Sequence, residues 1–252
     1  MPNNRYTRQL ALPEMSPEKQ EKLARSKILI VGAGGLGSAA LPYLVGAGIG
    51  YIVIADNDRV DISNLHRQTM YRTDQEGRVK STLAGAFLQE INPQINIYTI
   101  DQHINADNAV KLIERHSPDL LLDGSDNFET KSLLNDVSIE LRIPFICASI
   151  SQFEGQIGSF KGYKSDKPCY RCVFPEFPET SEVIGPLGTC AGVIGTLQAH
   201  ITLCRLLDIE LGHNEEHPFT RIDLKTLEIK HYNVNKDTKC PCCGAIKELD
   251  KN

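Results

Sequence analysis

The chain has 252 residues, a formal net charge of −5 and an ordinary share of apolar and charged residues. A chain of this length can bury a sizeable core, and its acidic balance argues against general binding to nucleic acid or to an anionic membrane surface. No apolar run is long enough to span a bilayer, and the N-terminal stretch MPNNRYTRQLALPEM lacks the apolar core of a signal peptide. We therefore expect a cytoplasmic protein whose eight cysteines are metal ligands, reactive thiols or core residues rather than disulfides.

Apolar strands alternate with helices through the first 150 residues. A short helix is predicted to begin at Ser16-Pro17-Glu18, because serine caps a helix N-terminus and proline suits the first turn. The chain then reads as strand 27–31, a glycine turn, a helix and a second strand that ends at Asp56. Further helices are expected at 78–92, 106–116 and 127–142, and further strands at 95–100, 120–123 and 144–148. This alternation predicts an α/β fold with a doubly wound, mostly parallel, Rossmann-like sheet.

The glycine turn after the first strand predicts a phosphate-binding site. Glycines let the backbone turn tightly and let a phosphate approach, and the following helix offers free N–H groups and the positive end of its dipole. Asp56 comes directly after the second strand, where an acidic side chain suits a ribose. The pattern indicates a nucleotide without saying which one. The glycines of this turn are Gly32, Gly34, Gly35 and Gly37.

From residue 151 the pattern changes. The segment EGQIGSFKGY at 154–163 predicts an antiparallel strand, and the proline-rich segment 174–189 predicts a loop that crosses the surface. A helix at 193–208 and strands at 219–224 and 227–232 complete the expected elements. We expect one domain over 1–252, with a nucleotide-binding half at 1–150 and an antiparallel second half at 151–252.

Two CxxC motifs lie in the second half, separated by a long insertion. Four thiolates from two such motifs suit a tetrahedral zinc ion with no open position, which predicts a structural site. A pair of redox-active CxxC motifs is the alternative. The four cysteines are Cys169, Cys172, Cys240 and Cys243.

The other cysteines are assigned different roles. Cys242 lies inside the second motif and is expected to be a spacer, whereas Cys147 and Cys204 have the apolar neighbours of core residues. Cys190 lies at a loop-to-helix junction, where a helix N-terminus can lower a thiol pKa, so it is a possible reactive thiol. A buried small residue is the alternative interpretation of Cys190.

Basic residues gather just after Asp56, although the chain as a whole is acidic. The sequence has no GxxxxGK[ST] motif, so a triphosphate at this glycine turn needs cations from elsewhere. Arg67 and Lys80 are the best candidates, and isolated solvated charges are the alternative. The basic residues in question are Arg59, Arg67, Arg72, Arg78 and Lys80.

Acidic residues follow the strand expected at 120–123. Asp126 can hold Mg²⁺ there, or it can lie near the N-cap of the next helix, and the residues alone leave both interpretations open. Because the carboxyl ends of parallel strands meet at one edge of a sheet, Asp56, Asp123 and Asp126 are expected to share one crevice with the glycine turn.

Ten sequence motifs occur in an order that spans nearly the whole chain. In this order the chain resembles the bacterial ThiF/MoeB/HesA adenylyltransferases, which are similar to the ubiquitin-activating enzymes. The motifs are RYTRQL, GAGGLGS, DNDRVDISNLHRQ, GRVKS, INP, DGSDNFETK, EGQI, PCYRC, GVIGTLQA and the terminal CPCC.

The resemblance implies an enzyme that uses ATP to adenylate the C-terminal glycine carboxylate of a ubiquitin-like sulfur-carrier protein. The carrier would end in Gly-Gly, pyrophosphate would be released, and the pathway would be thiamine or molybdopterin biosynthesis. The resemblance also implies bound Mg²⁺ and Zn²⁺, a homodimer, and a carrier-binding role for residues 151–252. Adenylation of a different peptide or carrier in a natural-product pathway is the alternative function.

The same resemblance implies roles for individual residues. Gly35 and Asp56 would bind the nucleotide, with Asp56 at the ribose and Asp58 in the same site, and Asp126 would coordinate Mg²⁺. Arg8 would reach the active site of the partner subunit, whereas composition alone favours a solvated arginine there. The phosphates would be held by Asn64, Arg67, Gln68 and Lys80, and the catalytic group would be Arg8, Arg67, Lys80 and Asp126.

The chain departs from the family pattern in its crossing loop. Family members often carry a cysteine there that can bond to the carrier. Here no cysteine precedes Gly185-Pro186 in the loop, and Cys190, which follows this pair, is the candidate replacement. The chain ends at the second CxxC motif, so we expect a separate sulfur donor.

Two functions of other classes are alternatives. An NAD-dependent oxidoreductase is compatible with Asp56 but lacks an evident hydride-transfer site and leaves the basic cluster unexplained. A non-enzymatic binding module is opposed by the presence of every expected ATP-site residue.

Overall fold

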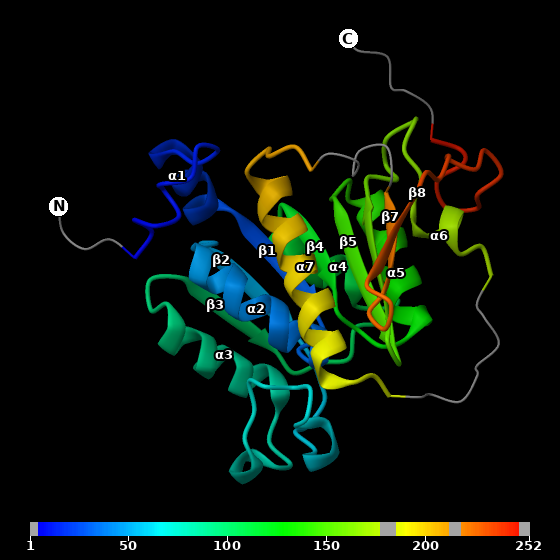
Figure 1. Cartoon of the computed structure of the whole chain (residues 1–252). Coiled ribbons are helices and arrows are strands. Elements are labelled where there is room, and N and C mark those ends of the chain that lie inside the picture. The colour runs from blue at the N-terminus through cyan, green and yellow to red at the C-terminus, as the bar shows by residue number, and fades with distance from the viewer. Residues whose placement is uncertain (1–4, 177–184, 212–217, 247–252) are drawn as a thin grey trace.

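The protein is built on one sheet with helices on both faces (Figure 1). The structure is a computed structural model that describes residues 5–176, 185–211 and 218–246. The sheet formed by these residues has eight strands in the order β3-β2-β1-β4-β5-β6-β7-β8. No helix in the described parts of the chain combines the length and the apolar character that a membrane crossing requires.

Strands β1 to β5 form the parallel half of the sheet. Strands β1 and β4 are nearly continuous runs of buried apolar residues, as expected for parallel strands covered on both faces. The strand order reverses between β1 and β4, and ligands bind at such a reversal in open α/β sheets. The expected mostly parallel α/β fold is therefore confirmed. The strand bounds are β1 Lys27–Val31, β2 Tyr51–Ala55, β3 Asn96–Ile100, β4 Leu120–Asp123 and β5 Phe145–Ser151.

The helices divide between the two faces of the sheet. One buried cluster joins α2, α3 and α7 to one face, and a second joins α4, α5 and the short α6 to the other. Helices α2 and α7 pack directly against each other across the first face (Figure 1). The helix bounds are α1 Pro17–Arg25, α2 Gly35–Ala47, α3 Lys80–Ile91, α4 Ala109–His116, α5 Phe128–Glu140, α6 Tyr170–Val173 and α7 Gly188–Leu206.

The second half of the chain extends the sheet with antiparallel strands, as the sequence predicts. These are β6 Glu154–Phe160, β7 Phe219–Asp223 and β8 Glu228–Tyr232. Helix α7 begins at Gly188, earlier than the expected 193, and α6 was not expected at all. Part of the predicted crossing loop, residues 177–184, lies outside the described residues.

The N-terminal segment lies at the end of the sheet opposite the glycine turn (Figure 1). Ser16 caps α1 by accepting a hydrogen bond from the Lys19 N–H, as predicted. Next to the exposed Arg8, the Gln9 side chain donates to the carbonyl of Ala47, the last residue of α2. Helix α2 has 13 residues, which is about 20 Å of helix. Arg8 is thus separated from the glycine turn of its own chain by the length of α2.

The close approach of α2 and α7 depends on Gly195. A Cβ at this position would lie 2.4 Å from the Leu36 carbonyl oxygen and 2.8 Å from Ala39 Cβ. We expect Gly195→Ala to lower the free energy of unfolding by about 1–3 kcal/mol through overpacking. Gly192→Ala in the same helix is the control, because no atom beyond the neighbouring backbone of α7 itself lies within 4 Å of an added Cβ there. That control should be neutral or stabilising by up to about 1 kcal/mol. Urea unfolding measures both values, and equal effects would contradict the packing argument.

Candidate functional site

The glycine turn connects β1 to α2 at the reversal point of the sheet. Gly32 has a φ of +99°, and a Cβ there would lie 2.7 Å from the backbone of Gly124 in the loop after β4. The N–H of Gly124 in turn donates to the Val31 carbonyl at 2.8 Å. The N-cap of α2 is Gly34, which supplies no side-chain cap, so the first N–H groups of the helix remain available to an anion.

Asp56 lies directly behind this turn, at the end of β2. Its carboxylate accepts hydrogen bonds from the Ala33 N–H at 2.7 Å and from the Asp58 N–H at 2.8 Å. Burial raises the pKa of Asp56, while the two N–H donors and the charge of Lys80 act in the opposite direction. The carboxylate thus fixes the shape of the turn, and it stays partly exposed at the end of the strand where a ribose is expected.

Lys80 and Tyr71 complete this side of the site. The Lys80 ammonium is almost entirely buried at the start of α3 and lies 2.9 Å from the Asp58 carboxylate. The buried Tyr71 hydroxyl donates to the Ala33 carbonyl at 2.8 Å and thereby fastens the segment 62–71 to the turn. Burial, followed by the charges of Asp56 and Asp58, raises the Tyr71 pKa, so this phenol is a neutral donor. The sequence contains no signal for this role of Tyr71, because an isolated tyrosine carries no pattern.

Residues 64–68 bring a cation to the other side of the turn. The Arg67 guanidinium donates to Asn64 Oδ1 at 2.5 Å and lies 2.7 Å from His66 Nε2. The Arg67 stem lies against Gly35, where an added Cβ would be 3.4 Å from Arg67 Cγ. The structure therefore places Asn64 and Arg67 at the helix N-terminus that the sequence pattern assigns to phosphate.

Gln68 provides a test of whether these residues suit a bound nucleotide. Its side chain is buried, lies beside Gly34, and its Oε1 has no hydrogen-bond partner. A buried acceptor without a partner is costly, and a donor on a bound nucleotide, such as a ribose hydroxyl, would supply the missing contact. The glycine turn and the free helix N-terminus fit a phosphate, and the unpartnered Gln68 Oε1 fits a donor group of the same ligand.

The loop after β4 closes the crevice. Asp123 is fully buried at the end of the strand, whereas Asp126 is exposed. Asn127, not Asp126, is the N-cap of α5 and accepts a hydrogen bond from the Thr130 N–H at 2.8 Å. Asp126 thus lies next to the N-cap, as one of its two interpretations has it, but its own carboxylate does not cap the helix. Mg²⁺ is commonly held by one or two carboxylates together with substrate phosphates, and Asp126 suits such a site.

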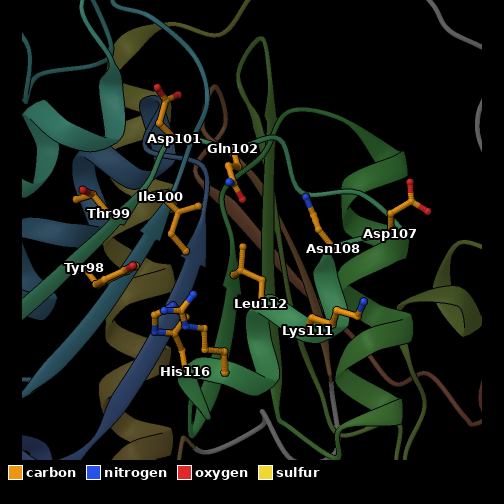
Figure 2. Close-up of a pocket in the computed structure, with 11 residues that line it drawn as sticks. Tyr98, Thr99, Ile100, Asp101, Gln102, Asp107, Asn108, Lys111, Leu112 and His116 are labelled. Atoms are coloured by element: carbon orange, nitrogen blue, oxygen red, sulfur yellow. The ribbon is translucent and has the colours of Figure 1, made fainter.

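A groove of about 430 Å³ lies beside this crevice, between β3 and α4 (Figure 2). Asp101 and Gln102 lie at one end of it, and His116 lies toward the other. None of the turn glycines, Arg67, Lys80 or Asp126 is among its lining residues. Ile100 connects the groove to the site, since its carbonyl accepts a hydrogen bond from the Asp56 N–H at 3.0 Å.

Cys190 is buried in the first turn of α7. Burial raises the pKa of its thiol. The neighbouring Ala191 packs against Gly35 of the glycine turn. These observations favour the interpretation of Cys190 as a small buried residue.

The four cysteines of the two CxxC motifs form one cluster. Their sulfur atoms all lie within 4.8 Å of one another. The individual Sγ–Sγ distances include 3.9 Å for Cys169–Cys172, 3.7 Å for Cys169–Cys240 and 3.4 Å for Cys172–Cys243. A tetrahedral zinc site with Zn–S bonds of 2.3 Å has sulfur atoms about 3.8 Å apart. The donor set and its spacing fit zinc.

Cys242 is not one of these four cysteines, but it packs against them and also contacts α5. Its thiol donates to Asp136 Oδ1 at 3.0 Å, and Arg171 of α6 donates to the same carboxylate through two nitrogens, at 2.8 and 2.7 Å. The bidentate Arg171 contact lowers the Asp136 pKa against the effect of burial. Cys242 thus joins the C-terminal segment to α5 and α6, a more specific role than the expected spacer.

Comparison with known proteins shows the family of this chain. The model of the ThiF family matches residues 6–242. The chain belongs to the ThiF family. It is 36% identical to the sulfur carrier protein adenylyltransferase of Thermus thermophilus, over 96% of this chain and 90% of that protein. It is 37% identical to the SAMP-activating enzyme E1 of Haloferax volcanii, over 98% of this chain and 93% of that protein. The chain is therefore an adenylyltransferase of this family, an enzyme class that uses ATP.

Two further comparisons concern length and fold. The chain is 36% identical to the adenylyltransferase and sulfurtransferase UBA4 of Saccharomyces cerevisiae over 98% of this chain but only 57% of that protein. Among solved structures, Escherichia coli MccB with ATP is similar with a TM-score of 0.80 and 22% identity, over 96% of this chain and 74% of that one. This similarity shows that the two proteins share the fold.

The cysteine cluster predicts a metal content. We expect the purified protein to contain one zinc ion per chain and Cys240→Ala to lose most of it, together with a lower melting temperature. Cys204→Ala, which removes a buried thiol outside the cluster, is the control and should retain the zinc. Elemental analysis and thermal unfolding measure the two effects. Zinc-free protein that is fully stable, or zinc retained in Cys240→Ala, would contradict the assignment.

Proposed function

We propose that this protein adenylates the C-terminal glycine carboxylate of a ubiquitin-like sulfur-carrier protein and releases pyrophosphate. Support comes from the similarity to a sulfur carrier protein adenylyltransferase, which extends over 96% of this chain. The part of this chain that matches the family includes the glycine turn, Arg67, Lys80 and Asp126. The proposed carrier ends in Gly-Gly and belongs to the thiamine or molybdopterin pathway. It would receive its sulfur from a separate donor after activation.

The proposed chemistry requires positioning and charge neutralisation rather than a general base. A carboxylate is already ionised at neutral pH, so it can attack the α-phosphorus of ATP without losing a proton. The attacking carboxylate and the triphosphate repel each other until cations neutralise them and fix them in line. A nucleotide on the N-terminus of α2 would have Asn64, Arg67 and Gln68 on one side, and Asp56 and Lys80 on the other.

Two groups would complete the site. Asp126 would hold Mg²⁺, whose charge would offset that of the phosphates. Arg8 would come from a second copy of the chain, because within one chain it lies at the far end of α2 from the turn. We accordingly propose a homodimer in which each site includes Arg8 of the other subunit.

Pyrophosphate exchange with purified carriers tests the function. We expect exchange of labelled pyrophosphate into ATP with a thiamine-type or molybdopterin-type carrier, because the acyl-adenylate forms reversibly. The same carrier without its two terminal glycines is the matched control and should give no exchange. Absence of exchange with both carrier types would contradict the proposal, and exchange with an unrelated peptide instead would replace the carrier by a peptide substrate.

Replacement of Asp126 tests the Mg²⁺ site. Asp126→Ala should lower the rate of carrier-dependent exchange by about 100-fold or more, as expected when a group that stabilises transferring charge is lost. Its melting temperature should match that of the wild type, because Asp126 is exposed and does not cap α5. Asp107→Ala, at another exposed loop carboxylate outside the crevice, serves as the control. Normal exchange by Asp126→Ala would remove the Mg²⁺ assignment.

A further inference from the structure

Lys131 of α5 connects three segments beneath the proposed active site. Its ammonium forms an ion pair with Asp123 Oδ2 at 2.5 Å, and it donates to the carbonyls of Ser125 and Ala148, both at 2.8 Å. These acceptors belong to the end of β4, to the loop after it and to β5. The Lys131 side chain is 4% exposed and the Asp123 side chain is 0% exposed.

The contacts of Lys131 use its full capacity to donate. An ammonium has three N–H donors, and the three acceptors here account for all of them. No donor is left for a phosphate, although Lys131 lies close to the glycine turn through Asp123 and Gly124. Lys131 therefore acts on the loop and not on a ligand.

The loop between β4 and α5 is held on both sides by this ion pair. The second oxygen of Asp123 accepts hydrogen bonds from the N–H and the hydroxyl of Ser125, at 3.0 and 2.5 Å. Lys131 holds the carbonyl of the same Ser125. The peptide unit that leads into Asp126 is thus fixed, because Asp126 follows Ser125 directly.

Other contacts tie this loop to the rest of the crevice. Gly124 packs against Gly32 of the glycine turn, and Gln198 of α7 donates to the Asp123 carbonyl at 2.8 Å. On the other side of Asp126, Asn127 caps α5. Asp126 is therefore an exposed carboxylate between two fixed neighbours, in a loop that contacts the phosphate turn.

We propose that Lys131 is a positioning residue for the Mg²⁺–ATP complex, because its three contacts set the direction in which Asp126 presents its carboxylate. This inference rests on the proposed adenylation and on the Mg²⁺ role of Asp126. Lys131 contacts neither the substrate nor the metal. Without Lys131 the Asp126 carboxylate would still be present, but the backbone that leads into it would be less ordered. The affinity of the site for Mg²⁺ would therefore fall.

The test separates positioning from simple charge compensation. Lys131→Met alone leaves Asp123 as a buried carboxylate without an opposite charge, which destabilises the fold for reasons unrelated to the metal. The double variant Asp123→Asn/Lys131→Met removes both charges and keeps an amide oxygen for Ser125, so it should recover most of the melting temperature. It does not restore the contacts with the Ser125 and Ala148 carbonyls. Ser138→Ala is the control, because it removes one buried hydrogen bond elsewhere on α5.

The readout is the dissociation constant of ATP, measured by calorimetry with and without Mg²⁺. We expect the gain in ATP affinity that Mg²⁺ provides to fall by about 10- to 100-fold in the double variant, the usual effect of losing a group that orients a metal ligand. ATP affinity without Mg²⁺ should stay near the wild-type value, and Ser138→Ala should keep the full gain. A double variant that folds and keeps the wild-type gain would overturn the proposal.

The proposed function fails by a different result. If the wild type shows no carrier-dependent pyrophosphate exchange, the adenylation of a carrier is wrong, yet the Mg²⁺-dependent gain in ATP affinity can still be read in every variant. Normal exchange by the wild type together with an unchanged gain in the double variant would overturn only the role of Lys131.

Discussion

The contact between Gly32 and Gly124 is the constraint on which the rest of the site depends. Two loops that follow neighbouring strands, β1 and β4, approach so closely that a single methylene group on Gly32 would collide with the opposite backbone. This approach brings the start of α2 to the loop that leads into Asp126. Because Asp56 and Tyr71 both bind Ala33 of the same turn, the second strand and the segment 62–71 are placed by it as well.

Charge is distributed unevenly around this contact. The chain is acidic overall, yet Arg67 and Lys80 lie at the turn, and both are held by neighbouring oxygens of Asn64 and Asp58. Cations that are already oriented lose little conformational entropy when an anion arrives. The acidic background would meanwhile disfavour polyanions in general. An acidic protein can thus have a selective phosphate site without becoming a general polyanion binder.

The sequence could predict a doubly wound, mostly parallel sheet and the place of the crevice, since alternation and the glycine turn are local patterns with fixed consequences for such a sheet. It could not predict where α7 begins, because Gly188 is a weak helix former and its helical state follows from packing. Cys169 and Cys240 could be paired from spacing, since two CxxC motifs have few other uses. Lys131 could not be assigned a role, because its three acceptors come together only in the folded chain.

The cysteine cluster has a consequence for the integrity of the chain. Cys169 and Cys240 are 71 residues apart, and the region between them includes α7, β7 and β8. With a metal ion at the cluster, this part of the chain forms a closed ring, and β6 and β7 join it again through the sheet. A single peptide-bond cut between 173 and 239 would therefore open the ring without separating the fragments. After such a cut the two fragments would stay associated and behave as a single protein in solution.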